Sequence, residues 1–196
     1  SRLHRGLTSL AFLLAILASQ AAAAQRGAIT VPRNLGELSA QADSIVRGHV
    51  VSAQVEPHPE FKNLQTVVVT LSVEETLKGE PRTSFTFRQF IWDVRDRHGA
   101  AGYKKGQELL LLLNRPTRYG LSSPAGLEQG RFRIEREQGH VKAVNGIANR
   151  GLFRNMQARA AQRGITLSPR ASALVREHRE GAAGMRRRTW RPSTAS

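Results

Sequence analysis

The sequence predicts a mainly β fold: a small, five- to six-stranded, OB-like closed barrel with a short helix before its first strand. Six short strand-like segments follow one another, and no helical segment separates them as it would in a β-α-β fold. A β-sandwich is the alternative architecture for this pattern. The expected strands are 44–55, 66–73, 84–91, 108–113, 130–135 and 140–145.

The helix before the first strand is predicted over residues 32–43. Asn34 is a suitable N-cap, and Glu37 follows three residues later, as in a capping box. In the strand that comes next, Gly48 permits a bulge or the close approach of another backbone.

Two of the predicted strands have clear apolar patterns. Segment 66–73 alternates, so that Val67, Val69, Leu71 and Val73 share one face. Segment 108–113 is apolar after its first residue, and we expect it to be buried on both faces or central in the barrel.

The last two strands flank Gln138 and Gly139, which predicts a hairpin. After Gly146 the composition changes, and helices are predicted over 151–163 and 168–180. Ser168 would cap the second helix, with proline at its first position. Few apolar residues follow, so we expect the end of the chain to be disordered.

The first residues predict a secretory signal peptide. Basic residues precede an apolar stretch over 10–18, and four alanines over 21–24 provide an Ala-x-Ala end, with cleavage after Ala24. The apolar stretch is shorter than the about 20 residues that span a bilayer. A retained membrane anchor is the alternative. The predicted organisation is a signal peptide at 1–24, a β-barrel domain at 25–149, a helical extension at 150–180 and a disordered Arg-rich tail at 181–196.

Positive charge is concentrated at the C-terminal end. Residues 150–196 hold 11 arginines and no lysine against two glutamates, a net charge of +9, whereas residues 25–149 carry a net charge of +4. Such a segment could bind anionic polymers or lipids. An Arg-rich composition throughout the chain is the alternative explanation. The candidate polyanion contacts are Arg186, Arg187, Arg188 and Arg191.

No side-chain pattern predicts a metal site, a cofactor or an enzyme. The chain has no cysteine, which excludes thiolate ligands and cysteine nucleophiles. Asp93, Asp96 and His98 could offer metal ligands, but Arg95 and Arg97 lie between them and would repel a cation. A solvated loop is the favoured interpretation of this segment.

Other candidate groups are scattered. The histidines lack the His-x-x-x-His spacing that places two ligands on one helix face. Glu74 and Glu75 are adjacent in a strand, so they point to opposite faces and cannot share a substrate unless a bulge intervenes. Ser122 and Ser123 lack the Gly-x-Ser-x-Gly nucleophile motif.

Segment 84–91 and the loop after it form the candidate partner-binding surface. By strand parity, Gln89 shares a face with two phenylalanines, whereas Arg88 and Phe90 lie on the other face. Exposed aromatic residues beside arginine stack on bases in nucleic-acid-binding OB folds. Packing is the favoured interpretation, because burial dominates aromatic placement. The candidate surface comprises Arg88, Phe90, Trp92, Arg95 and Arg97.

Several motifs within residues 35–150 resemble a family of exported bacterial proteins of unassigned function. The family pattern is A-D-x-I-V-x-G, then V-E-E-x-L-K-G, then R-Q, then G-E-E-x-L-L-F-L. The matching segments here are 42–48, 73–79, 88–89 and 106–113. Such proteins are distantly similar in layout to the OB-fold domains of tissue inhibitors of metalloproteinases and netrins. The resemblance implies an exported binding or inhibitory module, but the inhibitors' zinc-binding N-terminal cysteine is absent here.

The sequence therefore predicts an exported, non-catalytic binding module that recognises a protein partner in the periplasm or the medium. The loop at 114–129 adds to the candidate surface. The alternative is an envelope-associated polyanion-binding protein that acts through its Arg-rich C-terminal segment.

Overall fold

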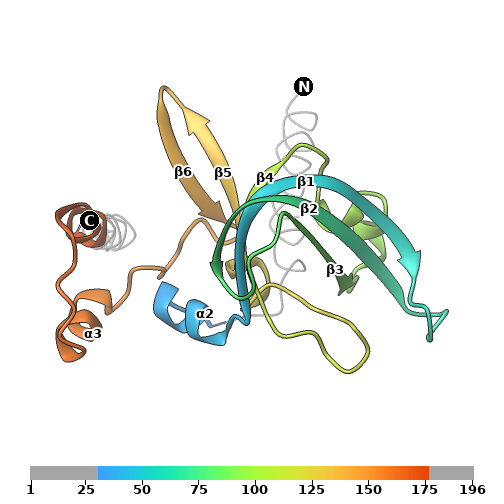
Figure 1. Ribbon diagram of the computed structural model, residues 1–196, viewed down its shortest axis with the longest axis horizontal. Helices are drawn as coiled ribbons and strands as arrows, with labels where there is room; N and C mark the ends of the chain where they lie inside the picture. The colour runs from blue at the N-terminus through green and yellow to red at the C-terminus, as the bar shows by residue number, and fades with distance from the viewer. Residues whose placement is uncertain (1–30, 177–196) are drawn as a thin grey trace, which may run out of the picture. The chain divides into compact units, whose positions relative to one another are not determined.

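The computed structural model describes residues 31–176, which form a mainly β structure, as predicted. Six strands, all paired antiparallel, make one sheet in the order β3-β2-β1-β4-β5-β6 (Figure 1). All six predicted strands are present, and the first two are longer than expected. The strands are β1 Ser44–Pro57, β2 Gln65–Lys78, β3 Ser84–Phe90, β4 Glu108–Leu113, β5 Arg131–Glu137 and β6 His140–Asn145.

The sheet is open, so the predicted closed barrel is not supported. Its edge strands are β3 and β6. The segment between β4 and β5 contains two prolines and three glycines before β5 begins. It meets the sheet through the isolated bridges Arg88–Leu121 and Leu113–Pro124 and through a bond from the Leu112 N–H to the Gly130 carbonyl (2.9 Å). Proline lacks a backbone N–H and glycine weakens a strand, so this segment forms no continuous ladder with β3.

The helix before the sheet is α2 Leu35–Gln41, and its capping box is confirmed. The Asn34 side chain accepts a bond from the Glu37 N–H (3.0 Å), and Glu37 accepts one from the Asn34 N–H (2.9 Å). Leu38 is fully buried against the sheet. Short 3-10 helices are η1 Val94–Arg97, η2 Ala100–Gly102 and η3 Leu127–Gln129.

The first predicted C-terminal helix is shorter than expected, because residues 151–155 form turns. Gly151 and Asn155 have positive φ angles (72° and 58°), and the helix α3 extends only over Met156–Gln162. A further helical segment begins at residue 169 and continues to 176, the last residue described. The Ser168 hydroxyl accepts a bond from the Ala171 N–H (3.2 Å), which confirms the predicted cap.

Gly48 lies where the backbones of β1 and β2 approach each other closely. A Cβ atom at this position would lie 2.1 Å from the carbonyl oxygen of Ser72. The β1–β2 register also shifts between Arg47 and Gly48. Both the bulge and the close approach that the sequence allowed are therefore present, and they help β1 and β2 to curve (Figure 1).

The central strand β4 divides two apolar clusters, as expected for a strand buried on both faces. Leu109, Leu111 and Leu113 face the cluster formed with β1, β2 and β3. Leu112 faces a second cluster, which includes Leu38 of α2 and also Phe132 and Leu152. The segment after residue 149 thus contributes to the core beside the sheet.

Two predicted segments, the signal peptide at 1–24 and the tail at 181–196, lie outside the described residues. Between residues 31 and 176, no helix combines the length and the apolar character that crossing a membrane would require.

Candidate binding groove

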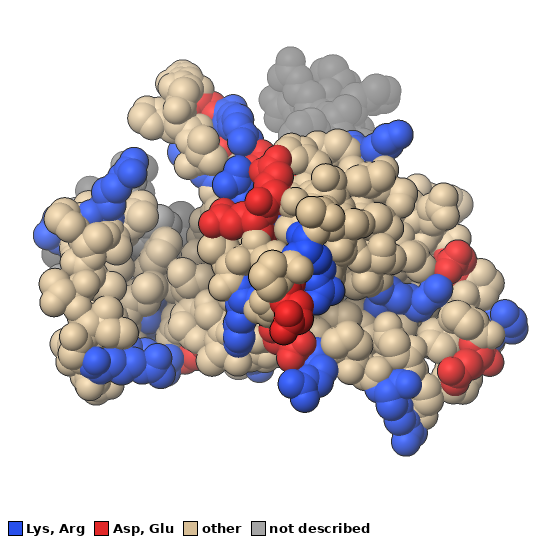
Figure 2. Space-filling model, in the orientation of Figure 1, with Lys and Arg blue, Asp and Glu red and all other residues tan. Residues whose placement is uncertain are grey.

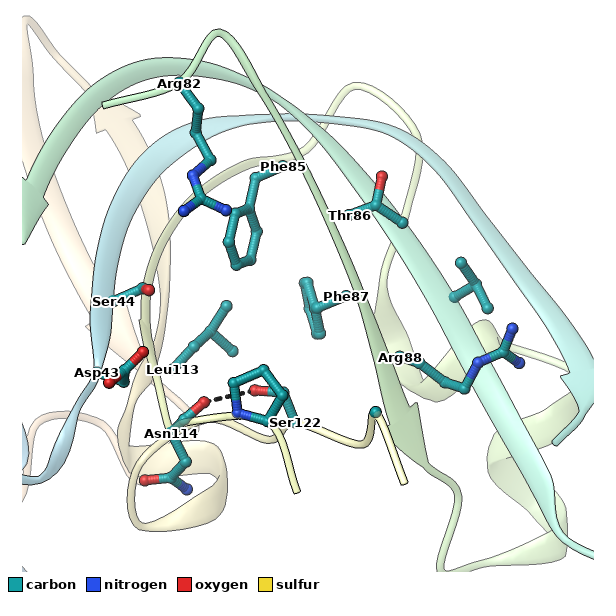
Figure 3. A pocket seen from close by; sticks show the side chains of 13 residues that line it. Asp43, Ser44, Arg82, Phe85, Thr86, Phe87, Arg88, Leu113, Asn114 and Ser122 are labelled. Carbon is teal, nitrogen blue, oxygen red and sulfur yellow. Dashed lines mark hydrogen bonds between the residues drawn. The ribbon is translucent and has the colours of Figure 1, made fainter. Parts of the chain in front are cut away.

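A cavity of about 410 Å³ opens beside the edge strand β3. Its walls come from β3, from the start of β1 and from the loop after β4 (Figure 3). The rings of Phe85 and Phe87 and the side chain of Leu113 point into its middle (Figure 3). The residues that line the cavity include Asp43, Arg82, Phe85, Thr86, Arg88 and Ser122.

The cavity follows the edge of β3 and is not confined to one face of it. Phe87 belongs to the buried core face of this strand, and Phe85 packs against the same cluster. Thr86 and Arg88 belong to the opposite face, yet they line the same cavity. In Figure 3 the Thr86 side chain points away from the two phenylalanine rings. We therefore describe this cavity as the β3 groove.

The hydrogen bonds between β2 and β3 determine which backbone groups of β3 face the groove. The Val73 N–H donates to the Thr83 carbonyl (2.8 Å), and the Ile91 N–H donates to the Gln65 carbonyl (3.1 Å). Backbone groups alternate in direction along an antiparallel strand. Odd-numbered residues of β3 therefore bond to β2, and even-numbered residues direct their N–H and C=O groups outward.

One of these outward groups already has a partner. The Arg88 carbonyl accepts a bond from the Ser122 N–H (2.8 Å), which forms the isolated parallel bridge. The outward N–H and C=O groups of Ser84 and Thr86 neither donate nor accept a hydrogen bond with any residue between 31 and 176. A short stretch of strand edge is thus unpaired, and Thr86 of this stretch lines the groove.

The wall opposite β3 is held in place by a buried histidine. His58, only 2% exposed, lies in the loop between β1 and β2. Its Nδ1 accepts bonds from the N–H groups of Glu60 and Phe61 (3.2 and 3.3 Å), so its Nε2 carries the proton and donates to the Tyr119 carbonyl (2.9 Å). The sequence did not indicate this role, because the two loops meet only in the folded chain.

Two of the three charged residues that line the groove are neutralised by neighbours. Arg88 pairs with Glu56 (2.6 Å), and Asp43 pairs with Arg115 (3.1 Å). Arg82 is exposed and forms no ion pair within the described part of the chain. Its guanidinium lies over the Phe85 ring at 4.8 Å from the centroid (Figure 3). The groove therefore has a single uncompensated positive charge near its free backbone edge.

The structure brings only part of the predicted partner-binding surface to the groove. Arg88 lines it, whereas Phe90 and Trp92 pack edge to face beside it (centroids 4.7 Å apart), with Trp92 80% exposed. Arg95 and Arg97 lie in η1 and are exposed, and Arg95 is paired with Asp93. The predicted polyanion contacts Arg186, Arg187, Arg188 and Arg191 lie outside the described residues.

A second charged cluster joins β2, β1, β4 and β5, and acidic and basic side chains lie close together near the β5–β6 hairpin (Figure 2). Glu108, 7% exposed, accepts bonds from Arg47 (3.0 Å) and Arg136. The hydrogen bond from Arg136 is the main reason why the pKa of Glu108 is lowered; the bond from Arg47 adds to it, and burial opposes it. This carboxylate is therefore ionised and paired.

The adjacent glutamates of β2 join the same cluster, because a bulge does intervene. Arg47 is opposite Glu75 and Gly48 is opposite Val73, which leaves Glu74 as the extra residue. Arg47 lies 3.1 Å from Glu74 and 3.6 Å from Glu75. The two carboxylates thus share an arginine of the chain itself. Within residues 31–176, no group of three or more His, Asp or Glu side chains is arranged to hold a metal ion.

Comparisons with protein-family models, with curated proteins and with solved structures find no match for this chain.

Proposed function

We propose that this chain is an exported, non-catalytic binding module that recognises a partner protein through the β3 groove. The observation that carries the proposal is the unpaired edge at Ser84 and Thr86, of which Thr86 lines a cavity with both apolar and polar walls. Unpaired strand edges are templates for pairing with another chain, and proteins normally cover, charge or shorten them. Here the edge enters, at Thr86, a groove with a preformed opposite wall.

The position of the groove supports the same proposal. It lies between the two segments from which the sequence predicted binding, β3 with the loop after it and the loop at 114–129. Loops held by a rigid sheet are common recognition sites. The predicted signal peptide and the resemblance to exported proteins support a periplasmic or secreted address.

The charged cluster around Glu108 is not suited to act as a general acid or base. Its buried carboxylate is already bonded to two arginines. A general acid or base needs a pKa near the working pH and a free position for the substrate. The pKa of Glu108 is shifted in the opposite direction, away from neutrality.

The test is affinity capture from an envelope and secreted extract with the full chain as bait. Arg82→Glu reverses the uncompensated charge in the groove. Arg133→Glu makes the same change on β5, where the side chain is 51% exposed and does not line the groove. We expect the wild type and the Arg133→Glu variant to retain a partner protein at moderate salt. The Arg82→Glu variant should not retain it.

Equal retention by all three baits would overturn recognition through the groove. If salt also removed the retained material, the Arg-rich C-terminal segment would be the binding element, because polyanion contacts weaken steeply with salt. A wild-type bait that retains no protein would likewise contradict the proposal.

A further inference from the structure

We infer that the occupant of the β3 groove is an extended, acidic segment of the partner protein, which adds to β3 as a further strand. This inference rests on the function proposed above and specifies how the partner binds. In strand addition, main-chain hydrogen bonds supply affinity and pockets for alternate side chains supply specificity. The β3 groove provides both features on one edge.

Within the chain, this edge already pairs with one residue of the loop after β4. Leu121 forms a parallel bridge with Arg88, and the Ser122 N–H bonds to the Arg88 carbonyl at 2.8 Å. The unpaired groups of Ser84 and Thr86 continue the same edge toward the start of β3. A segment bound there would occupy the space next to the loop and extend the pairing that the loop begins.

The walls predict the side-chain pattern of the bound segment. Alternate residues of a strand point to opposite faces. One set of the segment's side chains would face the partly exposed ring of Phe85, beside which the largely buried Phe87 and Leu113 also line the cavity (Figure 3). The other set would face solvent. An apolar residue at every second position therefore suits the groove.

The charge of the groove predicts an acidic segment. Arg82 is its uncompensated cation, since Arg88 and Asp43 already have ionic partners. A carboxylate beside Arg82 would form a charge-assisted hydrogen bond. A second copy of this chain fits less well, because each copy has a net charge of +15 and like-charged copies repel one another.

The decisive variant is Thr86→Pro in the full chain. Proline removes the outward N–H of this residue, and its ring obstructs an incoming strand. It should leave the β2–β3 ladder intact, because the N–H of Thr86 does not bond to β2 and edge strands tolerate proline at such positions. Thr86→Ala is the matched control: it also removes the Thr86 hydroxyl, which lies 3.0 Å from that of Thr70, but it keeps the N–H.

The probe is a library of displayed random 12-residue peptides, selected on the immobilised wild-type chain. We expect selected peptides with acidic residues, alternate apolar residues and no internal proline. They should bind Thr86→Ala within about twofold of the wild type and Thr86→Pro at least tenfold more weakly. Amide hydrogen exchange should show that the peptide protects the N–H of Thr86. Thermal unfolding of both variants establishes that they are folded.

Equal binding to the two Thr86 variants would overturn strand addition, as would peptides without acidic residues or a library that yields no binder. A dimer of the free chain that Thr86→Pro dissociates would assign the edge to a second copy instead. Recognition through the β3 groove and strand addition can be refuted separately. A captured natural partner that Arg82→Glu loses but Thr86→Pro retains would support recognition through the groove and refute strand addition.

Discussion

Gly48→Ala is the sharpest test of how the two long strands fit together. The new Cβ atom would lie 2.1 Å from the Ser72 carbonyl oxygen and 2.9 Å from the Cα atom of Val73. Contacts under 3.0 Å essentially do not occur for real Cβ atoms, so β1 and β2 would have to separate by about 0.9 Å. The obstructing atoms are backbone, and a rotamer change cannot relieve the contact.

The expected cost follows from that displacement. Overpacking that shifts the backbone costs typically about 1–3 kcal/mol, and a clash with the backbone of a paired strand belongs at the upper end. For a chain of this length, about 1 kcal/mol lowers the Tm by roughly 2–4 °C. We therefore expect Gly48→Ala to lower the Tm by about 6–12 °C. The bulge that brings Glu74 to Arg47 would be disturbed as well.

Thermal unfolding followed by circular dichroism measures the effect, with urea unfolding as a second assay. Gly99→Ala is the matched control, because no atom lies within 4 Å of its added Cβ and its φ is −110°. We expect this control to be neutral or slightly stabilising, since alanine restricts the unfolded chain. A Gly48→Ala protein as stable as the control would refute the close strand approach.

Further substitutions test the core, the ion-pair cluster and the helix cap, mainly through the free energy of unfolding in urea. Leu111→Ala should lower the free energy of unfolding by about 2–5 kcal/mol, and Leu110→Ala, at a partly exposed position, by clearly less. Leu111→Asp should prevent the formation of soluble protein, because it buries an unpaired charge. Abundant folded Leu111→Asp protein would show that the core is misplaced. The hydrogen bond from Arg136 lowers the pKa of Glu108 below its ordinary value of 4.5. The stability that ionised Glu108 contributes is therefore fully present above pH 4.5 and is lost as the pH falls through the lowered pKa. Glu108→Gln should therefore flatten the loss of stability on acidification, and an unchanged acid profile would contradict this assignment. Asn34→Ala should cost about 1 kcal/mol, because it removes the acceptor that caps α2, and no loss of stability would argue against the cap.

Much of the local structure was predictable because the interactions that determine it lie close together in the chain. The capping box joins Asn34 and Glu37, and Ser168 caps the helical segment that follows it. A strand's burial is also encoded locally: the apolar run of β4 has side chains on both faces, and both faces are buried. Gly48 indicated a close approach because no other residue would fit there.

The candidate site was predictable only in part. Arg88 and the loop at 114–129 were expected to take part in binding, and both line the β3 groove. Arg82 and the unpaired edge at Ser84 and Thr86 were not anticipated. Their importance depends on β3 being an edge strand, and residues 84–91 contain no signal that distinguishes an edge strand from a central one.

The sequence by itself determined where strands, caps and turns form, because these depend on residues a few positions apart. Tertiary structure alone decided that the sheet stays open, that Glu74 and Glu75 share Arg47, and that His58 holds the loop opposite β3. Each of these outcomes depends on the order and register of strands that are distant in the chain. Strand order and register are set by the packing of the whole core, which no local pattern specifies.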